Sequence, residues 1–390
     1  MGKIKTFIKR LIWFFIAIAI KIYTNVMHLF INKNKVVFMS FAGKQYSDNP
    51  KAISEELHKL RPETKIVWLL QNPKKYKGVV PDYVHVKKCN RISKIHHLAT
   101  AHVWVDNDNL VYRKKLDKSK KQLYIETWHG DRGLKRCFYD IEGYTRGFPF
   151  SINIEGYCDY FLVGSKFAEK TVRSMFRYDG TLLPCGYPRN DILFEKNEEK
   201  FNAIKERLGV EKDTKILLYA PTFRNDIDEK SALNIDLKRA IETLEKRDGK
   251  KWKVVLRVHH RGVDNEYNVP VVDGNNGFDM SELLFVSDML ITDYSSCLGD
   301  FIVTKRPVVL YATDYQDYKD YDRGVHFDIE KWPFMMAKNN DELENLLANL
   351  TEEKAKESSE GLLNLYGCYE NGTATKQVCE IIINKLNKKR

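Results

Sequence analysis

Histidines follow two strand-like segments of the chain, and a histidine at a strand end can act as a general base. His129 lies in the turn TWHG (127–130) after the segment QLYIE, and Gly130 beside it lets a ligand approach the main chain. His259 and His260 follow WKVVLRV, and because neighbouring side chains of an extended chain point to opposite sides, at most one of them faces a common site. The alternative for each turn is a histidine that satisfies only local backbone groups.

Hydroxyl, carboxyl and guanidinium groups follow other strand-like segments. Asp293, Ser295 and Ser296 come after DMLIT and lead into a predicted helix, where serine hydroxyls and helix-start N–H groups together suit a phosphate. The alternative is that one serine only caps the helix. Arg224 follows KILLYA, and Arg189 follows TLLPC. Arginine is the preferred partner of phosphate oxygens, although either residue could equally form a surface ion pair.

Two successive sets of short apolar strands alternating with amphipathic helices position these residues. This pattern predicts an α/β fold with two doubly wound, Rossmann-like parallel sheets. Ligands of such sheets bind beyond the carboxyl ends of the strands, and with two domains that means between them. We expect the chain to divide into a basic, apolar membrane-associating segment (1–36), an acceptor-side domain (37–205), a nucleotide-binding domain (206–360) and a C-terminal helix with a basic tail (361–390).

The formal charge of +11 lies entirely at the two ends of the chain. Residues 1–36 contain seven cations and no acid, and the last six residues contain four cations and no acid, so residues 37–384 balance to zero. Nucleic-acid binding requires a basic face on the folded domain, so the distribution argues against it. Basic ends instead favour an anionic membrane surface, near which each cation contributes on the order of 1 kcal/mol.

The apolar run LIWFFIAIAI (11–20) is preceded by Lys9 and Arg10 and interrupted by Lys21. A membrane span needs about 20 predominantly apolar residues, and the segment reaches that length only by including several polar ones. Three interpretations remain open: an interfacial amphipathic helix, a single span, and a helix docked on the protein itself. The flanking cations favour the cytoplasmic face of the membrane, with the protein peripheral or held by one span.

Several other chemistries have no support in the sequence. The seven cysteines are scattered without a C-x-x-C pair, which disfavours a disulfide framework or a structural zinc site. Neither G-x-G-x-x-G nor G-x-x-x-x-G-K-[ST] occurs after a strand. Asp106-Asn107-Asp108 supplies only two carboxylates in a polar loop, so we predict no metal site.

Taken together, the strand-end motifs resemble those of the CDP-glycerol glycerophosphotransferases, which prime and extend wall teichoic acid. The resemblance runs from about residue 36 to about residue 330, with five motifs in family order: SFAGKQYSDNP (40–50), TWHG (127–130), GYPRND (186–191), APTFRND (220–226) and SDMLITDYSSCLGDF (287–301).

The resemblance implies a glycosyltransferase-B-like fold and the transfer of polyol phosphate from CDP-glycerol or CDP-ribitol to a lipid-linked acceptor, with release of CMP and no metal or other cofactor. It assigns His129 as the base that activates the acceptor hydroxyl. His259, or His260 in its place, would neutralise the donor phosphates. Ser295 and Ser296 would bind the pyrophosphate, assisted by Arg224. Asp293, Arg189 and Gly130 are further candidates for the site.

The chain departs from the family pattern at two turns. After TWHG the family usually has residues like Thr-Pro-Leu-Lys, whereas this chain has DRGLKR (131–136), on the acceptor side. The family generally has proline after the histidine that matches His259. Two other functions stay open: a sugar transferase of the same fold that uses a nucleotide sugar, and an inactive scaffold at the membrane. The sequence leaves the oligomeric state open, an oligomer included.

Overall fold

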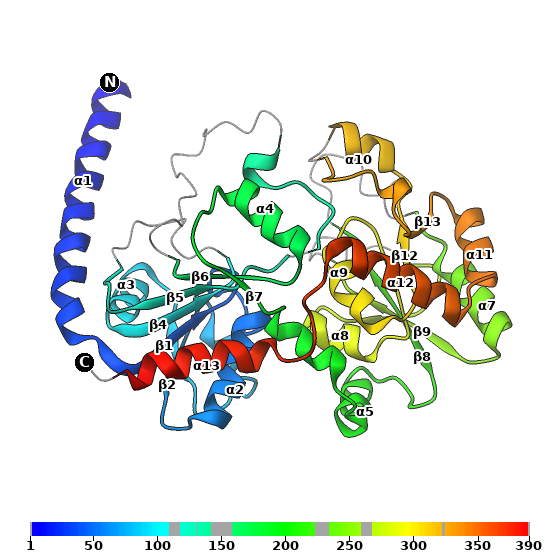
Figure 1. Ribbon diagram of the computed structural model, residues 1–390, viewed down its shortest axis with the longest axis horizontal. Helices are drawn as coiled ribbons and strands as arrows, with labels where there is room; N and C mark the ends of the chain where they lie inside the picture. Colours follow the sequence, from blue (N-terminus) through cyan, green and yellow to red (C-terminus); the bar gives the residue numbers. More distant parts are fainter. Residues whose placement is uncertain are drawn as a thin grey trace.

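The computed structural model describes residues 2–108, 118–130, 132–141, 158–222, 234–258, 267–321 and 324–388. Within these ranges the chain forms two α/β lobes that lie side by side, each built on one parallel sheet (Figure 1). The predicted α/β fold with two parallel sheets is therefore confirmed. Arg224, His259 and His260 lie outside the described residues.

The first lobe contains a sheet with the strand order β3-β2-β1-β4-β5-β6-β7, in which all neighbouring strands are parallel. Its strands are β1 (Asn32–Met39), β2 (Lys65–Leu70), β3 (His85–Lys88), β4 (Ala101–Asp106), β5 (Leu123–Glu126), β6 (Tyr160–Val163) and β7 (Leu182–Pro184). Consecutive residues of β1 alternate between the two apolar cores, as in a sheet covered on both faces. One core contains helices α3 (Arg91–Ala99) and α4 (Lys166–Phe176); the other contains α2 (Asp48–Leu60) and α13 (Ala374–Asn387).

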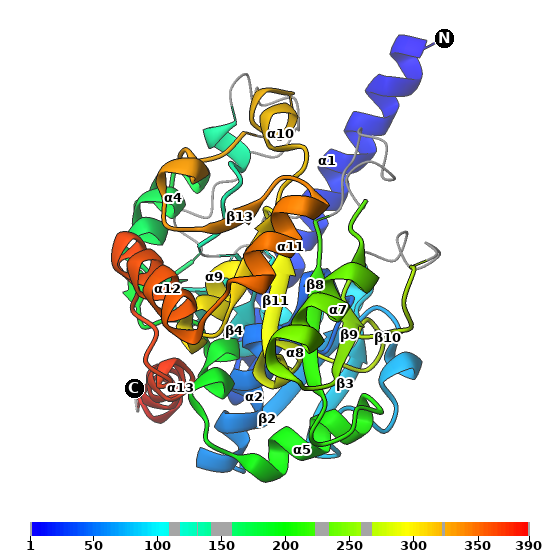
Figure 2. The same cartoon turned by 90° about the vertical axis from the view of Figure 1, so that its right-hand side faces the viewer.

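The second lobe has the strand order β10-β9-β8-β11-β12-β13, again entirely parallel. In chain order this is 3-2-1-4-5-6, the order of doubly wound nucleotide-binding sheets. The strands are β8 (Lys215–Ala220), β9 (Trp252–Leu256), β10 (Val271–Asp273), β11 (Met289–Thr292), β12 (Val308–Tyr311) and β13 (Met335–Ala337). They are flanked by α7 (Leu237–Asp248), α8 (Met280–Val286), α9 (Cys297–Phe301), α10 (Tyr315–Tyr321), α11 (Asn340–Ala348) and α12 (Glu352–Tyr366), as Figure 2 shows from the side of this lobe.

The chain crosses between the lobes twice. The first crossing runs through a 3-10 segment, η5 (Pro188–Phe194), to helix α5 (Glu198–Arg207). The second leads from α12 to α13, which returns to the first lobe and packs against α2 through Val378, Cys379 and Ile382 (Figure 1). The expected boundary at residue 360 falls inside α12.

Helix α1 (Gly2–Met27) projects from the first lobe in both views (Figures 1 and 2). The last turns of α1 dock on this lobe: Thr24 is buried, and the Tyr23 hydroxyl lies 2.8 Å from Nδ1 of His96 on α3. Several large apolar side chains before this point are exposed, among them Phe14 and Phe15 at 60% each. None of the described helices, α1 included, has the length and apolar character needed to cross a membrane.

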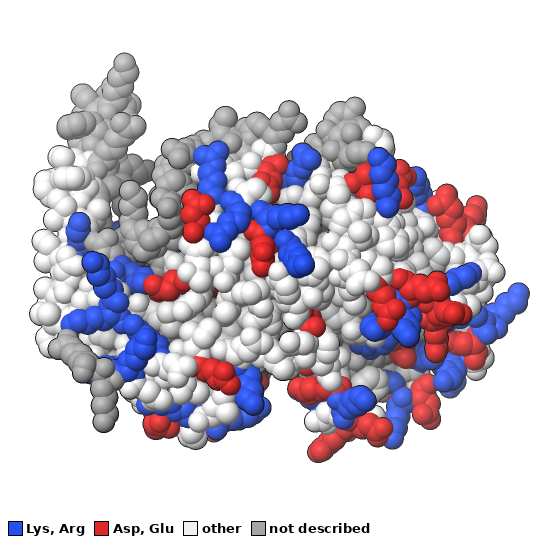
Figure 3. Space-filling view, viewed as in Figure 1, with Lys and Arg blue, Asp and Glu red and all other residues white. Residues whose placement is uncertain are grey.

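Basic side chains gather on one part of the first lobe. On the face in Figure 3, charges of both signs mix over the second lobe, while Lys and Arg gather around the base of α1. Lys385 of α13 lies within electrostatic range of Lys118 and Lys388, and burial together with these cations lowers its pKa, an effect that Asp159 opposes. Lys33 of β1 and Lys385 of α13 both lie within electrostatic range of His102, so cations from these two elements share this part of the first lobe.

Candidate active site

His129 is held at the carboxyl edge of the first sheet by its main-chain and aromatic neighbours. Its Nδ1 atom lies 2.5 Å from the carbonyl oxygen of Asn107, the residue after β4. Because a carbonyl only accepts hydrogen bonds, Nδ1 donates, and the neutral ring therefore presents Nε2 as its acceptor. The rings of Phe41 and Trp128 lie 5.2 and 4.2 Å from the imidazole, centroid to centroid. This tautomer is the one that a general base requires at Nε2.

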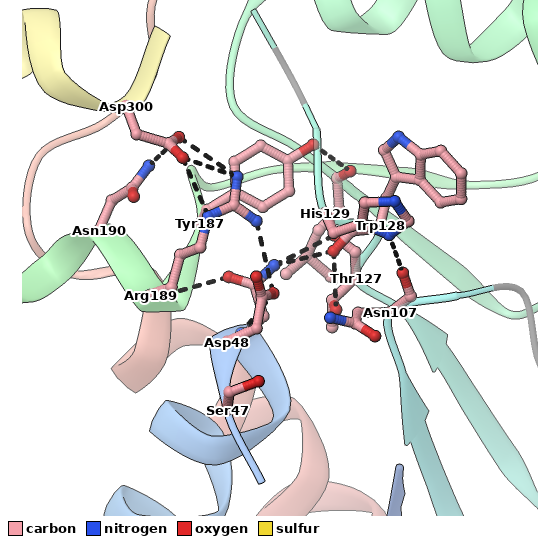
Figure 4. A network of polar contacts seen from close by, with 12 residues as sticks. Ser47, Asp48, Asn107, Thr127, Trp128, His129, Tyr187, Arg189, Asn190 and Asp300 are labelled. Carbon is pink, nitrogen blue, oxygen red and sulfur yellow. Dashed lines mark hydrogen bonds and ion pairs between the residues drawn. The ribbon is translucent and has the colours of Figure 1, made fainter. Parts of the chain in front are cut away.

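The turn that carries His129 has a left-handed backbone. Trp128 has φ +51°, and its N–H donates to a Glu126 carboxyl oxygen at 2.9 Å while its carbonyl accepts from Asn49 at 3.0 Å. Such a conformation is costly for a residue with a large side chain, so it persists where surrounding contacts hold it. Asn49 also accepts from the main-chain N–H of Arg189 at 3.0 Å. Motifs 40–50, 127–130 and 186–191 thus meet at one point (Figure 4).

Ser295 and Ser296 lie between β11 and α9 at the carboxyl edge of the second sheet, both half-buried. Ser296 occupies the N-cap position of α9 but makes no side-chain capping hydrogen bond there, and Ser295 Oγ lies 3.5 Å from the N–H of Cys297. Asp293, just before them, accepts the N–H of Thr222 on both carboxyl oxygens at 2.9 and 3.0 Å. The carboxylate therefore joins the serine turn to the start of the APTFR motif.

The two turns from opposite lobes meet at Gly130. A methyl group added to this glycine would lie 3.5 Å from Ser296 Oγ, and one added to Gly133 would lie 3.5 Å from Ser296 Cβ. Both distances are ordinary van der Waals separations, so a methyl group would fit between the two turns. The His129 turn and the serine turn therefore lie against each other across the two lobes in this structure.

Arg189 makes its contacts within the protein. Its side chain is 5% exposed, and its guanidinium forms ion pairs with Asp300 at 3.1 Å and with Asp48 at 3.4 Å (Figure 4). The pKa of Arg189 is raised because the attraction of Asp300 and Asp48 exceeds the effect of burial. The geometry favours a role in holding η5 and α2 against α9 over one in binding the donor.

A second buried arginine connects the His129 turn to the second lobe. Arg132 is fully buried, and it donates to the carbonyl of Gly299 at 2.7 Å and to the carbonyl of Gly164 at 3.1 Å. It also pairs with Glu370 at 3.0 Å, in the segment between α12 and α13. Glu370 accepts from Asn190 as well, at 2.8 Å. Both crossings of the chain are therefore tied to the loop that follows His129.

The family of the chain follows from its sequence. The model of the CDP-glycerol:poly(glycerophosphate) glycerophosphotransferases matches residues 21–384. The chain belongs to this family. The match covers nearly all of the described residues, and the resemblance seen in the five motifs is confirmed.

Curated members of this glycerophosphotransferase family act in teichoic acid synthesis. The chain is 32% identical over 374 residues to a teichoic acid poly(glycerol phosphate) polymerase of Bacillus spizizenii, covering 90% of this chain and 92% of that one. It is 32% identical over 404 residues to a teichoic acid glycerol-phosphate transferase of Staphylococcus aureus, covering 97% and 99%. It spans 42% of the longer polymerase of Bacillus subtilis, to which it is 35% identical.

Solved structures give the same relationship. The wall teichoic acid polymerase TagF is similar with a TM-score of 0.82 and 29% identity, over 99% of this chain and 97% of that one. A TagF variant soaked with CDPG is similar with a TM-score of 0.78 and 29% identity, over 92% of this chain and 90% of that one.

The sequence pointed to some of these residues and missed others. Among the residues that the sequence singled out, the fold brings together His129, Gly130, Ser295 and Ser296. Asp293 anchors the serine turn to Thr222. Asn49 and Asp300 lie within recognised motifs, but their partners are not evident from the motifs. Nothing in the sequence around Arg132 or Glu370 indicates that they pair, because 238 residues separate them.

Proposed function

We propose that this glycerophosphotransferase transfers polyol phosphate from a CDP-activated donor, CDP-glycerol or CDP-ribitol, to a hydroxyl group of a lipid-linked acceptor and releases CMP, in the synthesis of teichoic acid or a related surface polymer. The contact of Gly130 with Ser296 carries the proposal, because it joins a general base to a phosphate-binding turn. Family membership and the similarity to TagF, which was soaked with CDPG, support the donor class.

In the proposed reaction His129 acts as the general base. The acceptor hydroxyl transfers its proton to Nε2 as its oxygen bonds to the phosphorus of the polyol phosphate. The bond between that phosphorus and the bridging oxygen breaks, and CMP leaves with the electron pair. The hydrogen bond from Nδ1 to Asn107 fixes the ring for this task and stabilises the imidazolium that forms.

Stabilisation of charge on the transferring phosphoryl group is assigned to the chain's own groups, without a metal or other cofactor. Phosphoryl transfer depends mainly on positioning and on donors aimed at the non-bridging oxygens. We assign this role to Ser295 and Ser296, to Arg224, and to one of His259 and His260. Asp293 supports it by anchoring Thr222, which lies two residues before Arg224 in the sequence.

The arrangement of the two lobes agrees with a glycosyltransferase-B-like enzyme. In doubly wound sheets the ligand crevice lies where the strand order reverses, between β8 and β11 in the second lobe. Thr222 and the serine turn follow these two strands. We therefore assign the nucleotide to the second lobe and the acceptor to the first, whose switch point between β1 and β4 lies beside His129.

We also propose that the protein binds peripherally to the anionic, cytoplasmic face of the membrane through α1. Phe14, Phe15 and Ile22 on this helix are each 60% exposed, and Lys and Arg side chains gather around its base on the face in Figure 3. Apolar side chains inserted at the interface and cations beside anionic headgroups reinforce each other.

A donor screen tests the reaction. The full chain is incubated with a lipid-linked acceptor analogue and with CDP-glycerol, CDP-ribitol or a panel of nucleotide sugars, and the released nucleotide is quantified. The proposal expects acceptor-dependent CMP release from a CDP-polyol. Release of nucleoside diphosphate from a nucleotide sugar would instead identify a sugar transferase, and the absence of nucleotide binding by calorimetry would indicate a scaffold.

Flotation with lipid vesicles tests the membrane proposal. The wild-type chain is expected to float with phosphatidylglycerol vesicles, and a variant with serine at positions 14, 15 and 22 is expected to remain at the bottom. Substitution is preferable to removing residues 1–36, because β1 begins at Asn32 and its loss would damage the first sheet. Equal flotation of both proteins would refute a role for α1.

A further inference from the structure

The segment that follows the TWHG turn lies between β5 and β6 in the sequence but packs on the second lobe. We call residues 132–136 of this segment the strap. Leu134 at its centre is 0% exposed and lies in the apolar core that also contains residues of β8, β11 and β12. Its carbonyl oxygen accepts the N–H of His326 at 2.9 Å, and the N–H of Arg136 donates to the carbonyl of Gly324 at 3.2 Å. The strap therefore fixes the chain just beyond the turn to the second lobe.

Arg132 begins the strap with a buried guanidinium that reaches three parts of the fold. Its Nε atom donates to the carbonyl of Gly299 in the second lobe at 2.7 Å, and Nη1 donates at 3.1 Å to the carbonyl of Gly164, directly after β6 in the first lobe. Nη2 donates to Glu370, in the crossing between α12 and α13, at 3.0 Å. A guanidinium carries its N–H donors in a planar fork, so these partners fix both its position and its orientation.

The main chain of Arg132 is seated against α9, the helix that follows the serine turn. A Cβ atom added to Gly299 in this helix would lie 2.4 Å from Cβ of Arg132 and 3.1 Å from its carbonyl oxygen. The first distance is far inside van der Waals contact, so the strap can lie this close only because residue 299 is glycine. The N–H of Gly299 donates in turn to the carbonyl of Ser296 at 3.0 Å. Two hydrogen bonds therefore connect Arg132 to the serine turn through Gly299.

We propose that Arg132 is a positioning residue: through the strap it sets the place of His129 relative to the Ser295–Ser296 turn, so that the general base and the phosphate-binding turn are aligned across the two lobes. The inference rests on the proposed function, because it concerns the base and the donor phosphates of that reaction. Arg132 follows His129 by three residues and is fully buried, so it acts through the main chain and not on a substrate. A misplacement of about 1 Å between reacting groups can cost on the order of 10²-fold in rate.

Arg132→Lys tests the role of the guanidinium. One ammonium group keeps the positive charge beside Glu370 but cannot reproduce the fork that reaches both carbonyls. We expect at least about a tenfold fall in kcat for CMP release, with the KM for the CDP-polyol within about twofold of the wild type, since the donor is assigned to the second lobe. Leu134→Ala loosens the strap without touching the guanidinium and is expected to show the same division between kcat and KM.

Arg306→Lys is the matched control for the loss of an anchoring arginine. Arg306 donates to the carbonyls of Leu284 and Phe285 at 2.8 and 3.0 Å, and so anchors main chain within the second lobe. These partners lie in α8, before β11, whereas the serine turn follows β11. We expect a comparable loss of stability in urea unfolding, with kcat within about twofold of the wild type. Equal falls in kcat in the two lysine variants would show that Arg132 contributes only to stability and would overturn the proposal.

Hydrogen–deuterium exchange of the resting protein gives a readout that does not depend on turnover. The main-chain N–H groups of the TWHG turn (127–130) and of the strap are expected to exchange faster in Arg132→Lys than in the wild type or Arg306→Lys. Unchanged exchange there, or an unchanged kcat in folded Arg132→Lys, would refute the role of Arg132. Leu134→Ala carries both measurements if Arg132→Lys does not fold. If the wild type releases no CMP from any CDP-polyol, the proposed function fails, while the exchange rates still decide whether Arg132 holds the turn.

Discussion

The buried carboxyl group of Glu370, at the junction of the two lobes, makes the free energy of unfolding depend on pH. Its carboxyl group is fully buried between Arg132, Asn190 and the main-chain N–H of Tyr187, at 3.0, 2.8 and 3.1 Å. Burial raises the pKa of Glu370 to about 7 even though Arg132 attracts the ionised form. Replacing it with glutamine removes the titration while preserving the size of the side chain.

The magnitude follows from the difference between the folded and unfolded pKa values of this carboxyl group. The value rises from 4.5 in the unfolded chain to about 7 in the fold, so between these pH values the folded protein binds a proton that the unfolded chain has lost. The resulting stability is fully present below pH 4.5 and is lost as the pH rises through 7. Each pKa unit corresponds to about 1.4 kcal/mol, so the loss is on the order of 3 kcal/mol.

Urea unfolding at pH 5 and at pH 8, followed by tryptophan fluorescence, measures this loss. Because part of the loss has already occurred at pH 5, the wild type should lose about 2.5 kcal/mol more than Glu370→Gln between these two pH values. Other buried carboxyl groups, such as Asp279, titrate in both proteins and cancel in the comparison. Glu353→Gln, on the exposed side of α12, controls for the substitution itself. Parallel pH dependences for wild type and Glu370→Gln would refute the reasoning.

Two further predictions concern backbone space and the donor site. Gly43 and Gly78 have similar positive φ angles, +83° and +80°. A Cβ added to Gly43 would lie 2.9 Å from a main-chain carbonyl oxygen of β2, whereas a Cβ added to Gly78 would meet no atom. In urea titrations Gly43→Ala should therefore lower the free energy of unfolding by about 2 kcal/mol more than Gly78→Ala. Asp293→Ala removes the acceptor of the Thr222 N–H and should raise the KM for the CDP-polyol about tenfold with a smaller change in kcat. A larger loss in Gly78→Ala, or an unchanged KM in Asp293→Ala, would contradict the respective prediction.

The sequence predicts the parallel sheets and the central turns of the site because both depend on local pattern. Strand and helix periodicities indicate β-α alternation, and the carboxyl ends of parallel strands must lie along one edge of each sheet. This reasoning predicts that the His129 turn and the Ser295–Ser296 turn lie at the facing edges of the two sheets. The two turns lie against each other at Gly130, where an added methyl group would sit 3.5 Å from Ser296 Oγ.

Contacts between distant segments could not be predicted in the same way. Arg189 looked like a phosphate ligand from its motif, but Asp300, 111 residues away in the sequence, pairs with it across the lobes. Glu370 belongs to no motif, and its role depends on the return of α13 to the first sheet. The register that places Asp106 beside Glu126 at the ends of β4 and β5 is likewise not specified by local periodicity.

The most direct test of the account is CMP release from a CDP-polyol by His129→Ala, measured with a lipid-linked acceptor beside the wild type and His85→Ala. His85 lies exposed on β3, the edge strand of the same sheet, and serves as the matched histidine control. The account predicts a fall in kcat of about 10²–10⁴-fold in His129→Ala alone, with folding and donor binding unchanged. Equal turnover by all three proteins would contradict the assignment of His129 as the base and the reaction built on it.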